Sequence, residues 1–132
     1  MAGVTLDTGA LIAAGQDDRR FWVWWKWLTL KGLVASVPSP VVAQAWRGPR
    51  DARLAIVLGG CREVPLDGTA SRRTGELCAR AGTADVMDAF VVRGAADRKE
   101  DVLTSDPGDL RALAAHAPGV GTIRTIDELG AR

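Results

Sequence analysis

The amino-acid sequence predicts a single α/β domain built around a parallel sheet. Short β-rich runs alternate with helical stretches along the whole chain, which is the pattern of parallel βα units. The chain has 132 residues, a length typical of one domain, and no linker, repeat or low-complexity segment divides residues 1–132. Hydrophobic residues make up 47% and charged residues 25%, close to the composition of an ordinary globular protein. We therefore expect one domain with one hydrophobic core.

The first half of the chain predicts two strands and four helices. A strand over residues 3–7 leads directly into a helix that opens at Thr8. Asp17 and Asp18 can cap the next helix, which extends to about residue 30. The remaining elements are a strand at residues 33–37, a helix at 41–46 with proline near its first turn, and a helix at 51–58.

The second half of the chain predicts three strands and three helices. Thr83 can cap a long helix, and a later apolar strand ends at Asp106. Parallel strands present their carboxyl ends at one edge of a sheet, so Asp7 and Asp106 emerge together if their strands are neighbours. In chain order, the elements are a strand at residues 62–66, a helix at 69–81, a helix at 83–97, a strand at 101–105, a helix at 107–115 and a strand at 121–124.

Carboxylates at the ends of apolar stretches are the most informative feature of the sequence. Asp7 closes the first strand, Asp88 lies in the long helix with Asp85 three residues before it, and Asp106 closes the fourth strand. Positions i and i+3 share one side of a helix. Clustered carboxylates repel one another without a cation, and their oxygens suit a hard ion such as Mg2+. Aspartate also favours caps and turns, so each residue alone has a structural explanation, whereas all of them together favour an acidic pocket.

Charge and cysteine content exclude several classes of protein. The net charge of +1 gives no sign of a nucleic-acid partner. Arginines nevertheless cluster locally along the sequence, and these clusters could form basic rims around an acidic centre or solvated faces of helices. Cys61 and Cys78 are accompanied by one histidine, His116, and by no CxxC, which argues against a zinc finger and favours two free thiols. Without a signal peptide or a membrane-spanning apolar run, we expect a cytoplasmic protein that does not enter a membrane.

Four motifs, taken in order, resemble those of a PIN domain, in particular the VapC-type toxins of bacterial toxin–antitoxin pairs. The resemblance covers residues 4 to about 125, nearly the whole chain. Each motif is weak by itself, and their order and spacing give the resemblance its specificity. They are residues 6–13 (Leu-Asp-Thr-Gly-Ala-Leu-Ile-Ala), 40–48 (Pro-Val-Val-Ala-Gln-Ala-Trp-Arg-Gly), 85–92 (Asp-Val-Met-Asp-Ala-Phe-Val-Val) and 103–110 (Leu-Thr-Ser-Asp-Pro-Gly-Asp-Leu).

The resemblance implies a metal-dependent endoribonuclease with a three-layer α/β/α fold and a parallel sheet of about five strands. By matching position, Asp7, Asp88 and Asp106 are the expected catalytic acids that bind Mg2+ or Mn2+, and Asp85 is a further candidate ligand. Thr104 precedes Asp106 by two residues and can hydrogen-bond into the pocket or contact the substrate. The implied partners are an RNA substrate, a cognate antitoxin and a second copy of the chain in a homodimer.

Gln44 departs from the family pattern, which usually has glutamate at this position. An amide can still accept a hydrogen bond from a water molecule, but it adds no charge and is a poorer base. Asp85 could supply the missing negative charge. The alternative function is therefore a PIN-like module that binds RNA or protein and in which catalysis has weakened. Arg47 ends the same helix, where it can grip a phosphate, pair with a pocket acid, or simply complement the helix dipole.

Four of the five tryptophans fall within six residues of the second predicted helix. A helix turns 100° per residue, so we expect that these indoles cannot all point into one core. One interpretation is that half of them pack under the sheet. The other is an apolar surface for the antitoxin or for a second copy, because tryptophan is frequent in interface hot spots; stacking on RNA bases is a third possibility. The predicted interface residues are Trp22, Trp24, Trp25 and Trp27.

Overall fold

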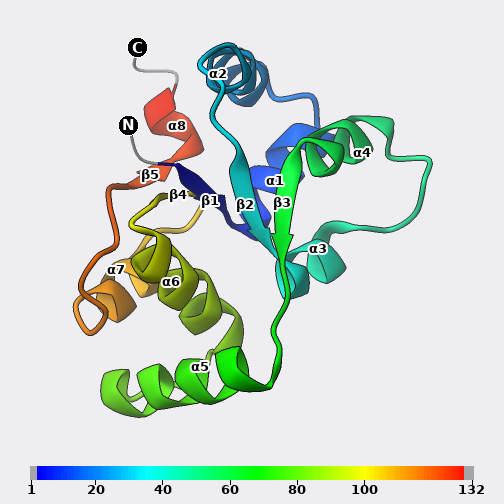
Figure 1. Cartoon of the computed structure of the whole chain (residues 1–132). Coiled ribbons are helices and arrows are strands. Elements are labelled where there is room, and N and C mark those ends of the chain that lie inside the picture. The colour runs from blue at the N-terminus through cyan, green and yellow to red at the C-terminus, as the bar shows by residue number, and fades with distance from the viewer. Residues whose placement is uncertain (1–2, 130–132) are drawn as a thin grey trace.

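The computed structural model describes residues 3–129 and contains a five-stranded parallel sheet in the order β3-β2-β1-β4-β5 (Figure 1). This confirms the predicted fold class. The chain crosses from one side of β1 to the other between β3 and β4, and ligands of such sheets bind beyond the strand ends where the order reverses. The strands are β1 (Val4–Leu6), β2 (Ala35–Pro38), β3 (Cys61–Val64), β4 (Asp101–Thr104) and β5 (Ile123–Thr125).

Helices cover both faces of the sheet, which gives the three layers (Figure 1). α1 and α4 pack together on one face, while α6 contacts β1 and β4 on the other face and is flanked by α5 and α7. No helix within residues 3–129 is long and apolar enough to cross a lipid bilayer. The helices are α1 (Thr8–Gly15), α2 (Arg19–Leu30), α3 (Ser39–Ala45), α4 (Ala52–Gly59), α5 (Gly68–Ala81), α6 (Val86–Arg98), α7 (Gly108–Ala114) and α8 (Ile126–Leu129).

The clearest departures from the sequence prediction are α6 and α8. α6 begins at Val86 rather than after a Thr83 cap, because Asp85 is its N-cap and accepts a hydrogen bond from the Asp88 N–H at 3.0 Å. Thr83 instead accepts a hydrogen bond from the Asp85 N–H at 3.1 Å, ahead of the helix. α8 was not predicted, since its four residues are too few to show a helical period.

β1 and β4 are parallel neighbours, as the position of the acids requires. Leu6 pairs with Leu103, and the Asp7 N–H donates to the Leu103 carbonyl at 3.0 Å. Side chains alternate along a strand. Leu6 therefore points into the core, while Asp7 shares a face of the sheet with Thr5, the face that α6 covers.

A buried carboxylate, Glu100, lies at the amino end of β4 and is 5% exposed. It accepts hydrogen bonds from the hydroxyls of Thr5 at 2.8 Å and Ser36 at 3.2 Å. Arg98, at the end of α6, donates its Nε–H to Glu100 at 2.7 Å, and Arg62 lies 3.6 Å away. Both carboxylate oxygens therefore have partners, and the negative charge is balanced. This network was not predicted from the sequence.

The tryptophans of α2 all contact the core, so the expectation that they could not do so is wrong. Trp24 is 7% exposed, and the other three indoles are partly buried against the same core. Three of them cluster around buried Phe21, whose ring lies 5.6 to 6.0 Å from the rings of Trp22, Trp24 and Trp25. α2 packs against α1 and α8, and wide indole rings reach these neighbours from both sides of the helix. The partner interface on these residues stays a prediction.

Both cysteines are free, as predicted. Cys78 is buried on α5, and Cys61 is half-buried at the start of β3. Burial raises the pKa of Cys61 to about 12, so its thiol stays protonated at neutral pH.

Candidate active site

An open pocket of about 290 Å³ lies at the carboxyl ends of β1 and β4, and we call it the acidic pocket. Its lining contains no lysine or arginine, so its carboxylates have no balancing cation among the side chains that form it. The structure brings together every predicted metal ligand here, together with Gln44 and Thr104. The lining residues that carry charge or hydrogen-bonding groups are Asp7, Thr8, Gln44, Asp85, Asp88, Thr104, Ser105 and Asp106.

Asp7 lies deepest in the acidic pocket and is 8% exposed. It follows β1 and occupies the N-cap position of α1, but its side chain makes no capping hydrogen bond. The Thr104 hydroxyl donates to Asp7 Oδ2 at 2.9 Å, and Thr104 itself is 1% exposed. Thr104 therefore orients the Asp7 carboxylate. Burial raises the pKa of Asp7, and the negative charges of Asp85 and Asp106 raise it further.

Asp85 and Asp88 enter the acidic pocket from the first turn of α6. The capping bond uses one Asp85 oxygen, so Asp85 lies just outside the helix rather than on one of its faces. Asp88 is half-buried. Burial, followed by the charges of Asp85 and Asp7, raises the pKa of Asp88 to about 7. A carboxyl group with this pKa readily exchanges its proton for a cation at neutral pH.

Asp106 stands on the loop after β4, and its N–H donates to the Thr104 hydroxyl at 3.2 Å. This loop passes close to α1 at Gly9. A Cβ atom at Gly9 would lie 2.1 Å from Ser105 Oγ, so only glycine allows this approach. The short contact between α1 and the loop keeps Asp106 on the same pocket as Asp7.

Gln44 reaches the acidic pocket from α3. The Thr8 hydroxyl donates to Gln44 Oε1 at 2.5 Å. The amide oxygen is therefore held in place and faces the pocket with an uncharged group, where the family pattern has a carboxylate.

Asp109 is a candidate that the sequence analysis missed. Within residues 3–129, one group of acids brings a carboxylate oxygen from each member to within 4.8 Å of the others, and it consists of Asp85, Asp88 and Asp109. Asp7 and Asp106 line the same pocket as Asp85 and Asp88 but stand back from this group. The spacing of three residues between Asp106 and Asp109 was the available signal, and α7 begins there.

Arg47 does not line the acidic pocket. Its guanidinium donates to the carbonyl oxygens of Ala43 at 3.1 Å and Trp46 at 2.7 Å, at the carboxyl end of α3. This arrangement matches the alternative in which the arginine complements the helix end. A role in binding the substrate stays a prediction.

The donor set fits a hard divalent cation. All of its charged groups are carboxylates, no histidine or cysteine is among them, and the pocket is open enough for water to complete a coordination sphere. Mg2+ keeps several of its water molecules, so carboxylates that stand back from one another can hold it both directly and through water. The uncompensated negative charge is the physical reason to expect the ion.

Solved structures with the same fold include two VapBC structures bound to DNA. The VapBC2 complex of Rickettsia felis, crystallised with a DNA fragment from its promoter, matches with a TM-score of 0.67 and 14% identity over 92% of this chain and 97% of the matched chain. DNA-bound VapBC from Salmonella typhimurium matches with a TM-score of 0.64 and 20% identity, covering 96% and 99% of the two chains. PAE2754 from Pyrobaculum aerophilum matches with a TM-score of 0.62 and 16% identity, covering 99% and 98%.

These likenesses show that the chain has the PIN-type fold implied by its motifs. No protein-family model matches the sequence, and no curated protein sequence matches it either.

Proposed function

We propose that the chain is a Mg2+- or Mn2+-dependent endoribonuclease that acts as the toxin of a toxin–antitoxin pair. The observation that carries this proposal is the acidic pocket, which gathers four carboxylates without a basic side chain at the switch point of the sheet. Carboxylates in this position bind cations, and phosphodiester hydrolysis is the chemistry that a hard cation serves best there. The PIN-type fold shared with VapBC complexes supports the same activity.

We assign different roles to the residues of the acidic pocket. Asp7, Asp88 and Asp106 would hold the cation, with Asp85 or Asp109, whose carboxylates lie close to Asp88, as a further ligand. A bound cation supplies Lewis-acid activation of water and neutralises charge on the phosphodiester.

Other groups orient these ligands and the attacking water. Thr104 fixes the rotamer of Asp7 through its 2.9 Å hydrogen bond. The Gln44 oxygen, held by Thr8, can accept a hydrogen bond from the water that attacks the phosphorus atom and so orients it.

The proposed partners are suggested by the fold that the chain shares with VapBC structures. VapBC complexes contain a toxin and its antitoxin, and we propose that this chain likewise binds a small antitoxin and forms a homodimer in the cytoplasm. The partly buried tryptophans of α2 are the proposed contact surface. Co-expression of the chain with the product of an adjoining reading frame, followed by size-exclusion chromatography, tests both associations.

RNA cleavage tests the catalytic proposal. The purified chain should cleave single-stranded RNA with Mg2+ or Mn2+ and lose this activity in EDTA. Asp7→Asn should abolish cleavage, because the deepest carboxylate of the acidic pocket is lost. Asp17→Asn is the matched control, since the side chain of Asp17 is 61% exposed and does not line the pocket. Cleavage that survives Asp7→Asn at the full rate contradicts the proposal.

A binding module is the second candidate, and Gln44 is the observation that favours it. The neutral amide removes a charge that the family pattern places in the acidic pocket, which weakens both cation binding and water activation. RNA binding without cleavage in either metal supports this candidate over the nuclease.

A further inference from the structure

A second pocket of about 220 Å³ adjoins the acidic pocket, and we call it the side pocket. The two share Gly9, Ile12 and Ser105 in their linings, so they are separated only by the start of α1 and the loop after β4. An RNA strand with a phosphodiester in the acidic pocket therefore has its next nucleotide within reach of the side pocket. We propose that the side pocket binds the nucleobase of this adjacent nucleotide, stacked on the guanidinium of Arg20. This inference rests on the proposed function.

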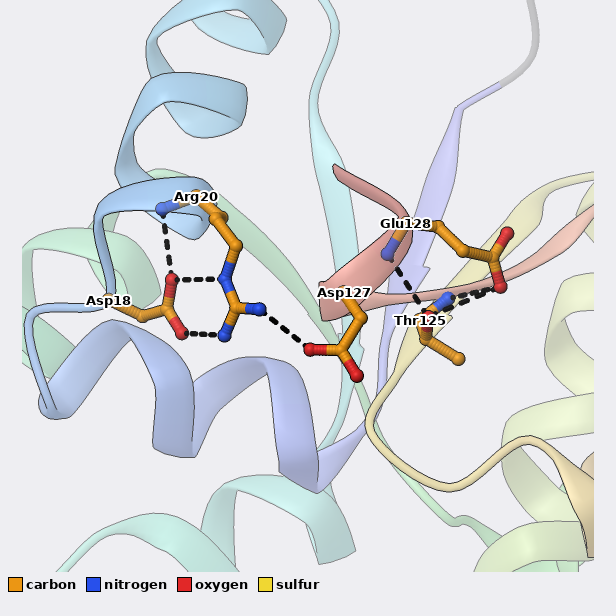
Figure 2. Close-up of polar contacts among 5 residues, drawn as sticks. All are labelled: Asp18, Arg20, Thr125, Asp127 and Glu128. Atoms are coloured by element: carbon orange, nitrogen blue, oxygen red, sulfur yellow. Dashed lines mark hydrogen bonds and ion pairs between the residues drawn. The ribbon is translucent and has the colours of Figure 1, made fainter. Parts of the chain in front are cut away.

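The charges of the side pocket suit an uncharged ligand better than a phosphate. Its lining includes Asp18 and Asp127 and a single arginine, Arg20. Arg20 is already paired with both acids, at 2.7 Å and 2.6 Å, so no positive charge is left over for a phosphate (Figure 2). The neighbouring aliphatic side chains, Ile12 and Ile126, offer apolar contact. A nucleobase is flat and neutral and has both apolar faces and polar edges.

Arg20 is held as a rigid, flat surface. Asp18 accepts hydrogen bonds from Arg20 Nε at 3.1 Å and from its second terminal nitrogen at 2.7 Å, and Asp18 is itself fixed as the N-cap of α2. Asp127 accepts from the third nitrogen (Figure 2). The N–H groups of a guanidinium lie in its plane, so these bonds engage its edge and do not use the faces on which a base would stack. Because the group is already ordered, stacking a base on it costs little conformational entropy.

Gln16 can read the edge of a base in the side pocket. Its side chain is exposed and lines this pocket at the end of α1, and its amide makes no hydrogen bond within residues 3–129. An amide offers one acceptor and two donors, the combination by which glutamine recognises base edges. Stacking would supply affinity, and Gln16 would supply preference among bases.

A cycle of protein and RNA changes tests the stacking directly. Binding is measured by fluorescence anisotropy in the Asp88→Asn background, which blocks cleavage, with labelled oligonucleotides carrying one abasic ribose at successive positions. With Arg20 present, one abasic position should weaken binding roughly tenfold, the value of one stacked base. Arg20→Lys keeps the charge but lacks the flat face, so the same abasic position should have no further effect.

Two further variants control this test. Arg53→Lys changes an arginine that pairs with Asp17 at 3.2 Å and lines neither pocket, and it should keep the full abasic effect. Gln16→Ala alters an exposed side chain that bonds to no other, so it should leave the thermal midpoint unchanged and reduce discrimination among bases at the same position. This variant tests the site even if Arg20→Lys loosens the contact between α2 and α8.

Several outcomes overturn the inference. An equal abasic effect with and without Arg20 shows that the base lies elsewhere. If Arg20→Lys weakens the binding of intact and abasic RNA by the same factor, Arg20 contacts a phosphate. If Arg20→Lys only lowers the thermal midpoint, the ion pairs of Arg20 are purely structural. Failure of the wild-type chain to cleave any RNA contradicts the proposed function instead, and the anisotropy cycle still decides the subsite.

Discussion

Buried carboxylates occupy both ends of the sheet face beneath α6, and the protein compensates their negative charge at only one of these ends. At the amino end, Glu100 is paired with Arg98 and Arg62 and bonded to two hydroxyls. At the carboxyl end, the acidic pocket gathers its carboxylates with no arginine or lysine in its lining. The same fold thus contains one balanced carboxylate and one unbalanced group, within the length of a single short strand.

The difference shows what separates a structural acid from one that we propose binds a ligand. A buried charge is tolerated when its hydrogen bonds and its charge are satisfied by the protein itself, as they are for Glu100. Burial and uncompensated neighbouring charges together raise the pKa of an acid, as at Asp88, and such acids persist where a ligand supplies the missing partner. Removing the acid at the amino end should therefore lower the free energy of unfolding of the metal-free protein. Removing an acid at the carboxyl end should raise it.

Glu100→Ala should produce the largest effect. The change leaves Arg98 without its partner and leaves the hydroxyls of Thr5 and Ser36 without an acceptor, so the free energy of unfolding should fall by about 3 kcal/mol. Urea unfolding followed by circular dichroism measures this loss. Glu63→Ala, at an exposed acid that accepts one hydrogen bond from Ser39, is the control and should cost less than about 1 kcal/mol. Similar losses for the two variants would contradict the comparison.

Divalent metal should stabilise the protein through the acidic pocket alone. At a Mn2+ concentration of about 100 times its Kd, the free energy of unfolding should rise by roughly 2.7 kcal/mol. Thermal unfolding during a Mn2+ titration measures the gain, and Asp7→Asn should remove it. Glu100→Gln is the informative control, since it alters the balanced carboxylate. If this variant loses the metal response to the same degree as Asp7→Asn, the two ends are not functionally distinct.

The stability of the metal-free protein should depend on pH through Asp88. Its pKa is raised from 3.8 to about 7, so between these values the folded state binds more protons than the unfolded state. The free energy of unfolding should therefore fall as pH rises from about 4 to about 7, by about 1 kcal/mol once solvent screening of this half-exposed group is allowed for.

Asp88→Asn should flatten that pH profile and leave the metal-free protein more stable at pH 8. Metal binding should have the opposite pH dependence, because protons compete with the cation for Asp88. Urea unfolding at a series of pH values, with and without Mn2+, measures both trends. A metal-free profile that rises through this interval would exclude the raised pKa.

Gln44→Glu should give the smallest effect and would sharpen the comparison. The change adds one more charge to the unbalanced end, so it should lower metal-free stability by a few tenths of a kcal/mol and tighten Mn2+ binding about fivefold, equivalent to about 1 kcal/mol. Isothermal titration calorimetry measures the affinity, and RNA cleavage should become faster. Gln16→Glu adds the same charge outside the acidic pocket and is the control for the Mn2+ affinity. Unchanged affinity and rate would show that the missing carboxylate was not limiting.

Features with a local sequence signal could be predicted, whereas those that depend on distant contacts could not. Asp18 was foreseen as the cap of α2, and the placement of Asp7 and Asp106 at one sheet edge followed from strand periodicity. Glu100 was missed because nothing around a single glutamate indicates that Thr5 and Ser36 will surround it. Asp109 was missed because its approach to Asp88 depends on how α7 packs beside α6.

In α2, helical periodicity underestimated how many aromatic side chains contact the core. The rotation of α2 by 100° per residue suggested that some indoles must face away from the core, but neighbouring elements lie on more than one side of this helix. A wide ring also covers more than its own helical position. The size of the indole rings and the packing of α1 and α8 against α2 therefore determine how far the tryptophans are buried.

The placement of the tryptophans gives the molecule its own optical reporter. The chain has five tryptophans and no tyrosine, four of the indoles pack on α2, and none lines the acidic pocket. Intrinsic emission excited near the red edge of the absorption band will follow the docking of α2 on the rest of the chain. It will stay almost silent when a cation enters the acidic pocket, so local loosening and ligand loading can be watched as separate signals in one unlabelled sample.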